Sequence, residues 1–235
     1  MPAKASPWLS RPPGSSWSLT HSMRPPTSGT TTTCWLGTTA PFGQLVVTNN
    51  DPAEAPIVVP THAVIEGPDL LVHLARPNPA WPHITAHPRV LFTVIGDDAY
   101  VPSTWRAKAG GPDEDGVPTS YYATAQFTCD AEIVTDPEAK AELLRTQLRH
   151  LQPEGDYALV DVNEPPYGRM IPGIWGLRLR IVDVVAKFKY DDHNPEEHRR
   201  AVIDRLAARG GVHDAGAAAQ QSRRLEERGE WQARI

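Results

Sequence analysis

Two long stretches of strand-like sequence constrain the fold of this chain most. They cover residues 119–134 and 176–190, and both are rich in β-branched and aromatic side chains, which favour β-strands. In the second stretch the apolar residues change from odd to even positions after Ile181. Because side chains alternate between the two faces of a strand, this change of phase predicts a β-bulge.

Shorter strand candidates precede these two stretches, at residues 44–48, 55–65, 69–75 and 89–97. The second and third are joined by Glu-Gly-Pro-Asp, which predicts a hairpin. Pro60 lies inside one of them, and it indicates an edge strand or a bulge because proline has no N–H to donate. Residues 89–97 are almost continuously apolar, as expected for a strand that is covered on both faces.

Two helices are predicted from their start and stop signals. Thr135-Asp136-Pro137-Glu138 matches a capping box, and the helix that it opens is stopped by Pro153 and Gly155. Asn194-Pro195-Glu196-Glu197 opens a second helix in the same way, and Gly210-Gly211 closes it. About six strands with two covering helices predict a mainly β fold, a small and mostly antiparallel barrel.

The first fifty residues differ in character from the rest. They contain no Asp or Glu, although the chain has 28 of them, and they are rich in Ser, Thr and Pro. Such a composition cannot bury enough apolar surface to offset its ordering entropy. We therefore expect residues 1–41 to be a disordered tail, a transit-type leader or a stretch translated from a wrong start or frame. Residues 42–211 are the expected folded domain, and 212–235 a peripheral helix or tail.

Composition narrows the functional classes. A net charge of −5 and a pI near 6.0 argue against a general nucleic-acid surface, which must neutralise several phosphates. Cys34 and Cys129 lie far apart and suggest neither a disulfide framework nor a zinc site, so a reducing cytoplasm is expected. No apolar run reaches the length of a membrane span. His83 and His87 have a metal-ligand spacing but no carboxylate nearby, and we expect no metal.

Polar and aromatic residues collect where predicted strands end. Hydroxyls and cations together suit a phosphate, and aromatic rings suit a flat conjugated ligand. The alternative is that the aromatic residues belong to the rim of the core and that the cations are solvated. The candidates for cofactor binding are His73, Arg76, Asn78, Trp81, Ser103, Lys108, Tyr121, Tyr122, Lys187 and Lys189.

Five segments of the chain resemble, in this order, the PaiB-like FMN-binding proteins, which are often labelled negative transcriptional regulators. The segments are LVVT, HLARPNPAW, DAYVPSTWRAK, VPTSYYA and KFKY, and the resemblance runs from Phe42 to Arg209. Its most specific element is H-x-A-R-x-N-P-x-W, which begins at His73. The family belongs to the split-barrel flavoproteins, which include the pyridoxamine phosphate oxidases.

The resemblance implies an FMN-binding split β-barrel that forms a homodimer, with FMN in a groove between the subunits. It implies that Arg76 contacts the phosphate or the ribityl chain. The sequence also departs from the family in two places. Ser120-Tyr121-Tyr122 stands where the family usually has Trp-Asn-Tyr, and residues 191–194 replace Ser-Gln-Asn-Arg by Asp-Asp-His-Asn.

The function expected from this resemblance is that of a flavin-dependent redox protein, or a flavin sensor, that acts on an unidentified small molecule. Two alternatives stay open. One is a transcriptional regulator with bound FMN, although the chain has no helix-turn-helix signature. The other is a degenerate barrel that has lost FMN and acts as an interaction module.

Overall fold

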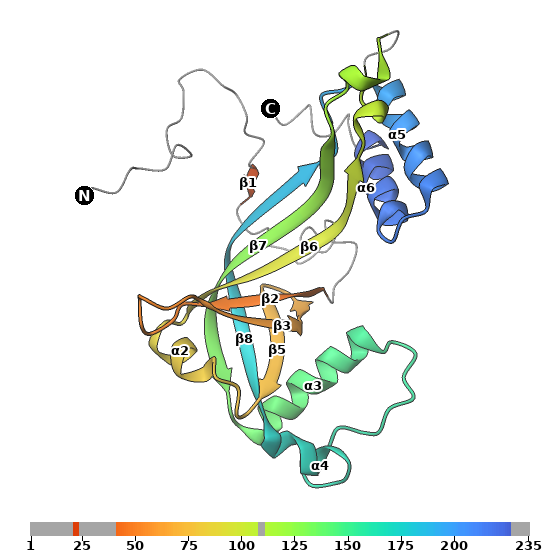
Figure 1. Cartoon of the computed structure of the whole chain (residues 1–235). Helices are drawn as coiled ribbons and strands as arrows, with labels where there is room; N and C mark the ends of the chain where they lie inside the picture. The colour runs from red at the N-terminus through yellow and green to blue at the C-terminus, as the bar shows by residue number, and fades with distance from the viewer. Residues whose placement is uncertain (1–20, 24–40, 108–110, 227–235) are drawn as a thin grey trace, which may run out of the picture.

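The computed structural model describes residues 21–23, 41–107 and 111–226 (Figure 1). Its strands form one antiparallel sheet with the order β3-β2-β6-β7-β8-β5-β4, and β1 pairs with the remaining edge of β8. The strands are β1 (His21–Met23), β2 (Phe42–Val47), β3 (Ile57–His62), β4 (Val64–Glu66), β5 (Asp69–Ala75), β6 (Arg89–Val101), β7 (Thr119–Val134) and β8 (Ile174–Lys189).

The described helices lie around this sheet. They are α2 (Trp81–Ala86), α3 (Pro137–Leu151), α4 (Tyr167–Met170), α5 (Glu196–Arg209) and α6 (Asp214–Glu226). Three short 3-10 turns accompany them: η1 (Ser103–Trp105), η2 (Asp113–Asp115) and η3 (Ile171–Gly173). None of these helices is long and apolar enough to cross a membrane.

The sheet curls because its two edge strands are consecutive in the chain. Only Ala63 separates β3 from β4, and its backbone N–H donates to the carbonyl of Pro41 at 3.0 Å. The chain thus passes from one edge of the sheet directly to the other, which gives an open barrel. Its interior is filled by large apolar side chains that are fully buried, among them Leu45, Val72, Phe92, Phe127 and Leu177. The predicted fold class, a mainly β split barrel with covering helices, is confirmed.

Strands β6, β7 and β8 extend beyond the barrel. Strand β2 pairs with residues 91–93 of β6, and β5 pairs with residues 174–180 of β8, so the further parts of the long strands have no barrel neighbours. We call residues 95–101, 119–125 and 184–189 the arm. Helices α5 and α6 cover one face of the arm (Figure 1), where Val101, Tyr121, Tyr190, Leu206 and Ala217 form a second core.

Most predicted elements are present. Residues 44–48 correspond to β2, 69–75 to β5 and 119–134 to β7, and Pro60 lies on the edge strand β3. The predicted bulge is confirmed in β8, because Thr128 pairs with Asp183 whereas Cys129 pairs with Ile181, which leaves Val182 between them. Strand β1 lies in a segment for which the sequence predicts no strand.

The two predicted helices differ in how they begin. Asp136 caps α3 as expected, since its side chain accepts the N–H of Ala139 at 2.9 Å. The cap predicted at Asn194 is wrong: Pro195 occupies the N-cap of α5, and no side chain accepts a hydrogen bond there. The end of α5 is as predicted, with Gly210 in the left-handed region at φ 64°.

Candidate flavin site

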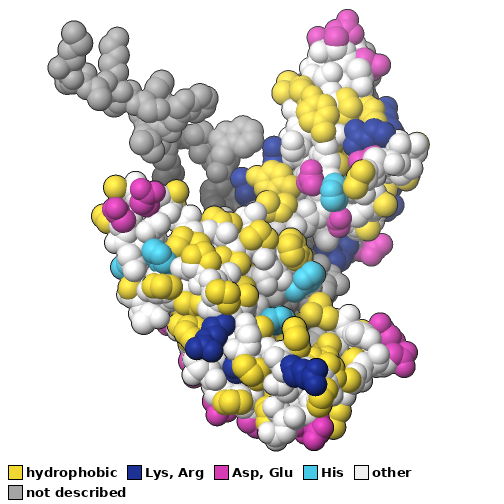
Figure 2. Space-filling model, turned by 60° about the horizontal axis from the view of Figure 1, so that its bottom comes forward, with side chains coloured by type: hydrophobic (Ala, Val, Ile, Leu, Met, Phe, Trp, Pro, Cys, Tyr) yellow, Lys and Arg dark blue, Asp and Glu magenta, His cyan; other side chains and the backbone are white. Residues whose placement is uncertain are grey.

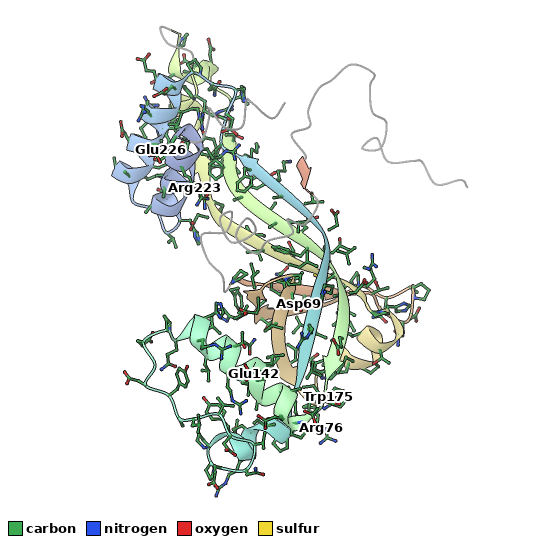
Figure 3. All side chains as sticks on the ribbon, turned by 180° about the vertical axis from the view of Figure 1, so that it is seen from behind. Asp69, Arg76, Glu142, Trp175, Arg223 and Glu226 are labelled. Atoms are coloured by element: carbon green, nitrogen blue, oxygen red, sulfur yellow. The ribbon has the colours of Figure 1, made fainter. Side chains whose placement is uncertain are left out.

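Most of the predicted cofactor residues that the structure describes lie near the two ends of β8. His73 pairs with Gly176 at the start of β8, whereas Tyr122 pairs with Lys189 at its end. Thirteen residue steps separate positions 176 and 189, and at about 3.3 Å per step this is about 40 Å along the strand. Figure 3 shows Arg76 and Trp175 at the barrel end and Arg223 and Glu226 near the arm end of the long strands. The two groups therefore cannot contact one FMN within one protomer.

The barrel-end group is built around the turn that follows β5. The side-chain oxygen of Asn78 accepts the N–H of Ala80 at 2.9 Å, and the indole N–H of Trp81 donates to the carbonyl of Ala75 at 3.0 Å. Trp81 is only 4% exposed, and its ring lies 5.2 Å from that of Trp175. Asn78 and Trp81 therefore shape the turn, while the side chain of Arg76 is exposed.

His73 is linked to helix α3. Its Nδ1 lies 2.6 Å from the side-chain oxygen of Gln147, whose amide nitrogen donates to the carbonyl of Leu71 at 3.0 Å. Because the Gln147 oxygen can only accept, Nδ1 of His73 must carry the proton. This pair fastens α3 to β5, so the position of His73 has a structural explanation that the sequence does not reveal.

The arm-end group contains an aromatic ring with two cations close to it. The ammonium groups of Lys187 and Lys189 lie 5.7 and 5.9 Å from the ring centroid of Tyr122, a range in which a cation and a ring face attract. Tyr122 pairs with Lys189, so all three side chains lie on the arm face opposite α5 and α6. Both lysines are exposed.

Tyr121 points to the opposite face of the arm. It is 0% exposed, donates its hydroxyl to Asp191 at 3.2 Å and accepts from Gln221 at 3.3 Å. Burial, followed by the negative charge of Asp191, raises the pKa of the Tyr121 hydroxyl well above its ordinary value. Tyr121 is thus a neutral hydroxyl in the second core, and Tyr122 is the tyrosine that a ligand can reach.

The loop after β6 carries two further predicted residues. Ser103 is half-buried in η1, and Lys108 lies outside the described residues. Arg106 anchors this loop with two hydrogen bonds to Asp191, at 2.8 and 3.2 Å. Gly116 packs so closely that an added Cβ would overlap the carbonyl oxygen of Ser103. The loop is held tightly against the end of β8.

The acids that replace the Ser-Gln-Asn-Arg segment have internal partners that the sequence analysis did not foresee. Asp191 binds Arg106 and Tyr121, whereas Asp192 binds Arg199 of α5 at 3.0 Å and also pairs with Arg224 of α6. The two acids join the end of β8 to the loop and to both C-terminal helices. The only sequence signals for these pairs are the arginines themselves, Arg106 in the loop and those in the two helices.

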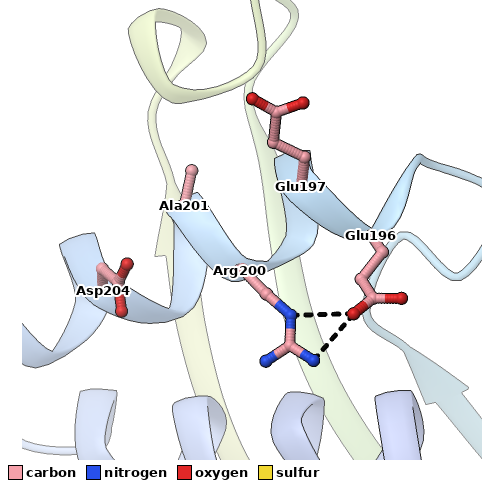
Figure 4. A pocket seen from close by; sticks show the side chains of 5 residues that line it. All are labelled: Glu196, Glu197, Arg200, Ala201 and Asp204. Carbon is pink, nitrogen blue, oxygen red and sulfur yellow. Dashed lines mark hydrogen bonds and ion pairs between the residues drawn. The ribbon is translucent and has the colours of Figure 1, made fainter.

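Other groups in the described part of the chain do not form a cofactor site. An open groove on α5 is lined by Glu196, Glu197, Arg200, Ala201 and Asp204 (Figure 4), and Arg200 already pairs with Glu196 at 2.7 Å. Its carboxylates would repel a phosphate. No cluster of three or more potential metal ligands occurs among the residues that the structure describes. Burial raises the pKa of the Cys129 thiol to about 12, which keeps it protonated.

The exposed candidates fit FMN in their chemistry. Within the described ranges, no carboxylate forms an ion pair with Arg76, Lys187 or Lys189, whereas many other arginines are paired. Arg76 presents a planar set of donors that suits a phosphate, and Tyr122 presents a ring that suits a flavin. The exposed residues whose chemistry fits FMN therefore lie in two separate groups.

Known structures share this fold. The flavocytochrome Anf3 from Azotobacter vinelandii is 21% identical, with a TM-score of 0.52 over 71% of this chain and 70% of that one. The FAD and heme binding protein from Mycobacterium smegmatis is 15% identical, with a TM-score of 0.50 over 74% of each chain. At these identities the likeness establishes the fold alone. No curated protein matches the sequence.

A family model gives the more specific result. The model described as "Putative FMN-binding domain" matches residues 32–183, which include β2 to β7, most of β8 and the motif around Arg76. The match covers well over half of the chain and agrees with the cofactor expected from the sequence. The chain belongs to this FMN-binding domain family, and FMN is its cofactor.

Proposed function

We propose that the chain is a PaiB-like flavoprotein that works as a homodimer, with each FMN held between two protomers. The observation that carries this proposal is the separation of about 40 Å along β8 between the barrel-end and arm-end groups. In a two-fold dimer the same two surfaces occur on both partners. Arg76 of one protomer can then meet the arm face of the other.

The outer face of the sheet supports a partner of this kind. Ile95 is 70% exposed and pairs with Thr124, which in turn pairs with Lys187, so the three side chains form one row across β6, β7 and β8. Phe42 and Val58 extend the exposed apolar surface across β2 and β3. Exposed apolar patches often mark interfaces. In Figure 2, hydrophobic side chains are spread over the barrel between separate clusters of Lys and Arg.

The bound FMN supplies the capacity to accept and donate electrons. The residues of this chain hold the cofactor. Arg76 of one protomer binds the phosphate or the adjoining ribityl chain, and the arm-end group of the other protomer, Tyr122 with Lys187 and Lys189, contacts the rest of the FMN. We infer a redox protein, or a flavin sensor, that acts on a small molecule in the cytoplasm. The regulator alternative gains no support from the net charge of −5 or from the acids on α5.

Two measurements on the purified chain test this proposal. Its absorbance spectrum should contain flavin bands, and chromatography of the flavin released on denaturation should identify FMN rather than FAD. Sedimentation at micromolar concentration should give the mass of a dimer. A stable monomer that retains FMN would contradict the shared site, and a colourless protein that takes up no added FMN would contradict the cofactor assignment.

A further inference from the structure

Lys140 is a buried cation at the fourth residue of α3, and neither the motif nor the family match draws attention to it. Only 5% of the surface of Lys140 is exposed. Its ammonium group donates to the carbonyl of Ile171 at 2.8 Å and to that of Ile174 at 3.1 Å. Ile171 is the first residue of η3, the short turn that leads into β8, and Ile174 is the first residue of β8.

The same turn also binds the backbone of Arg76. The backbone N–H of Arg76 donates to the carbonyl of Gly173 at 2.8 Å, and Ala75 pairs with Ile174. Lys140 and Arg76 therefore contact one three-residue turn, from α3 and from β5. Any change in the position of η3 would move the backbone from which the Arg76 side chain extends.

Electrostatics link the two cations as well. Burial lowers the pKa of Lys140, and the positive charge of Arg76 lowers it further, while Asp136 at the start of α3 opposes the change. Two like charges near each other are unfavourable unless an anion approaches them. A phosphate bound at Arg76 would relieve this repulsion and favour the charged form of Lys140.

We propose that Lys140 is a positioning residue for the phosphate end of the flavin. It fixes the turn beneath Arg76 and adds a second positive charge to the phosphate subsite. This inference rests on the proposed function, because it requires the phosphate to lie at Arg76. The ligand group that Lys140 helps to recognise is the phosphate monoester of FMN and not the flavin ring. A purely structural lysine would stabilise the barrel end equally for ligands with and without a phosphate.

Riboflavin, which lacks the phosphate of FMN, separates the two roles. Lys140→Gln keeps an N–H donor for the carbonyls but removes the charge, and Lys140→Met removes both. We expect Lys140→Gln to weaken FMN binding about tenfold, which corresponds to about 1.4 kcal/mol, and to leave riboflavin binding nearly unchanged. Arg169→Gln, which removes an exposed cation on neighbouring α4, is the control and should not alter the preference for FMN.

The pH dependence of wild type provides a second readout, and it can be measured even if the variants do not fold. Because phosphate favours protonated Lys140, the wild-type preference for FMN over riboflavin should fall as pH rises through the lowered pKa of this lysine, below the ordinary value of about 10.4. In Lys140→Gln the preference should stay constant over this range. Comparison with riboflavin cancels the titration of the flavin ring, which both ligands share.

Clear outcomes would overturn the inference. They are an equal loss of FMN and riboflavin binding in Lys140→Gln, no loss of either, or a wild-type preference for FMN that does not change between pH 7 and about 10. If wild type binds riboflavin and FMN equally at neutral pH, the phosphate subsite itself is absent. If it binds neither flavin, the proposed function fails, and this inference fails with it.

Discussion

Replacing Arg76 by alanine should weaken FMN binding without unfolding the protein. The guanidinium is exposed at the end of β5 and has no carboxylate partner among the described residues, so its donors are available to a phosphate. Charge-assisted hydrogen bonds contribute about 1.5–3 kcal/mol each, and about 1.4 kcal/mol is a factor of ten. We therefore expect the dissociation constant to rise roughly ten- to a hundredfold, measured by quenching of flavin fluorescence.

The stability of the variant should be close to that of wild type. The turn is held by backbone and indole hydrogen bonds of Asn78, Trp81 and Gly173, none of which involves the Arg76 side chain. Arg76→Lys should recover only part of the affinity, because an ammonium lacks the planar fork of donors. Arg200→Ala, at an exposed arginine on α5, is the matched control. Binding by Arg76→Ala within twofold of wild type would refute the phosphate role.

Three further predictions concern the second core and its loop. Asp191→Ala leaves Arg106 without its carboxylate, and urea unfolding should detect a loss of about 3–5 kcal/mol, as is usual when one partner of a buried pair is removed. Gly116→Ala places a Cβ where it overlaps the backbone oxygen of Ser103 in η1, so calorimetry should record a melting temperature lower by several degrees; an unchanged value would contradict the packing. Asp214 has a lowered pKa because of its hydrogen bonds with Arg209, so its contribution is present above its unfolded pKa of about 3.9 and is lost as pH falls below it. In Asp214→Asn this acid-dependent part of the unfolding free energy should disappear.

The sequence predicted the fold well because local patterns determine it. Alternation over residues 119–134 gives β7 with the same bounds, and the change of phase after Ile181 marks the bulge at Val182. The stop signal at Gly210 is equally local. The cap at Asn194 was wrong because the following proline took the N-cap position itself.

The candidate site was harder to predict, because proximity in the sheet depends on strand length and register. The motif that begins at His73 contains one exposed cation and several residues that shape its turn, and spacing alone does not distinguish them. The ion pairs of Asp192 depend on two helices that follow it in the chain, and the ion pair of Asp191 depends on Arg106, in a loop far before it. Lys140 lies among ordinary helix residues, and only the carbonyls around η3 reveal its role.

The shared site is tested most directly by mixing two variants that each bind FMN poorly. Arg76→Ala lacks the barrel-end cation, and Lys187→Ala/Lys189→Ala lacks the arm-end cations, so each homodimer should bind FMN poorly. After the two proteins exchange subunits, each mixed dimer contains one site with all its residues, and random exchange should restore about a quarter of the wild-type sites. Recovery of high-affinity FMN binding to that level is the result that we predict. Binding that stays as weak in the mixture as in the separate variants would contradict a site built from two protomers.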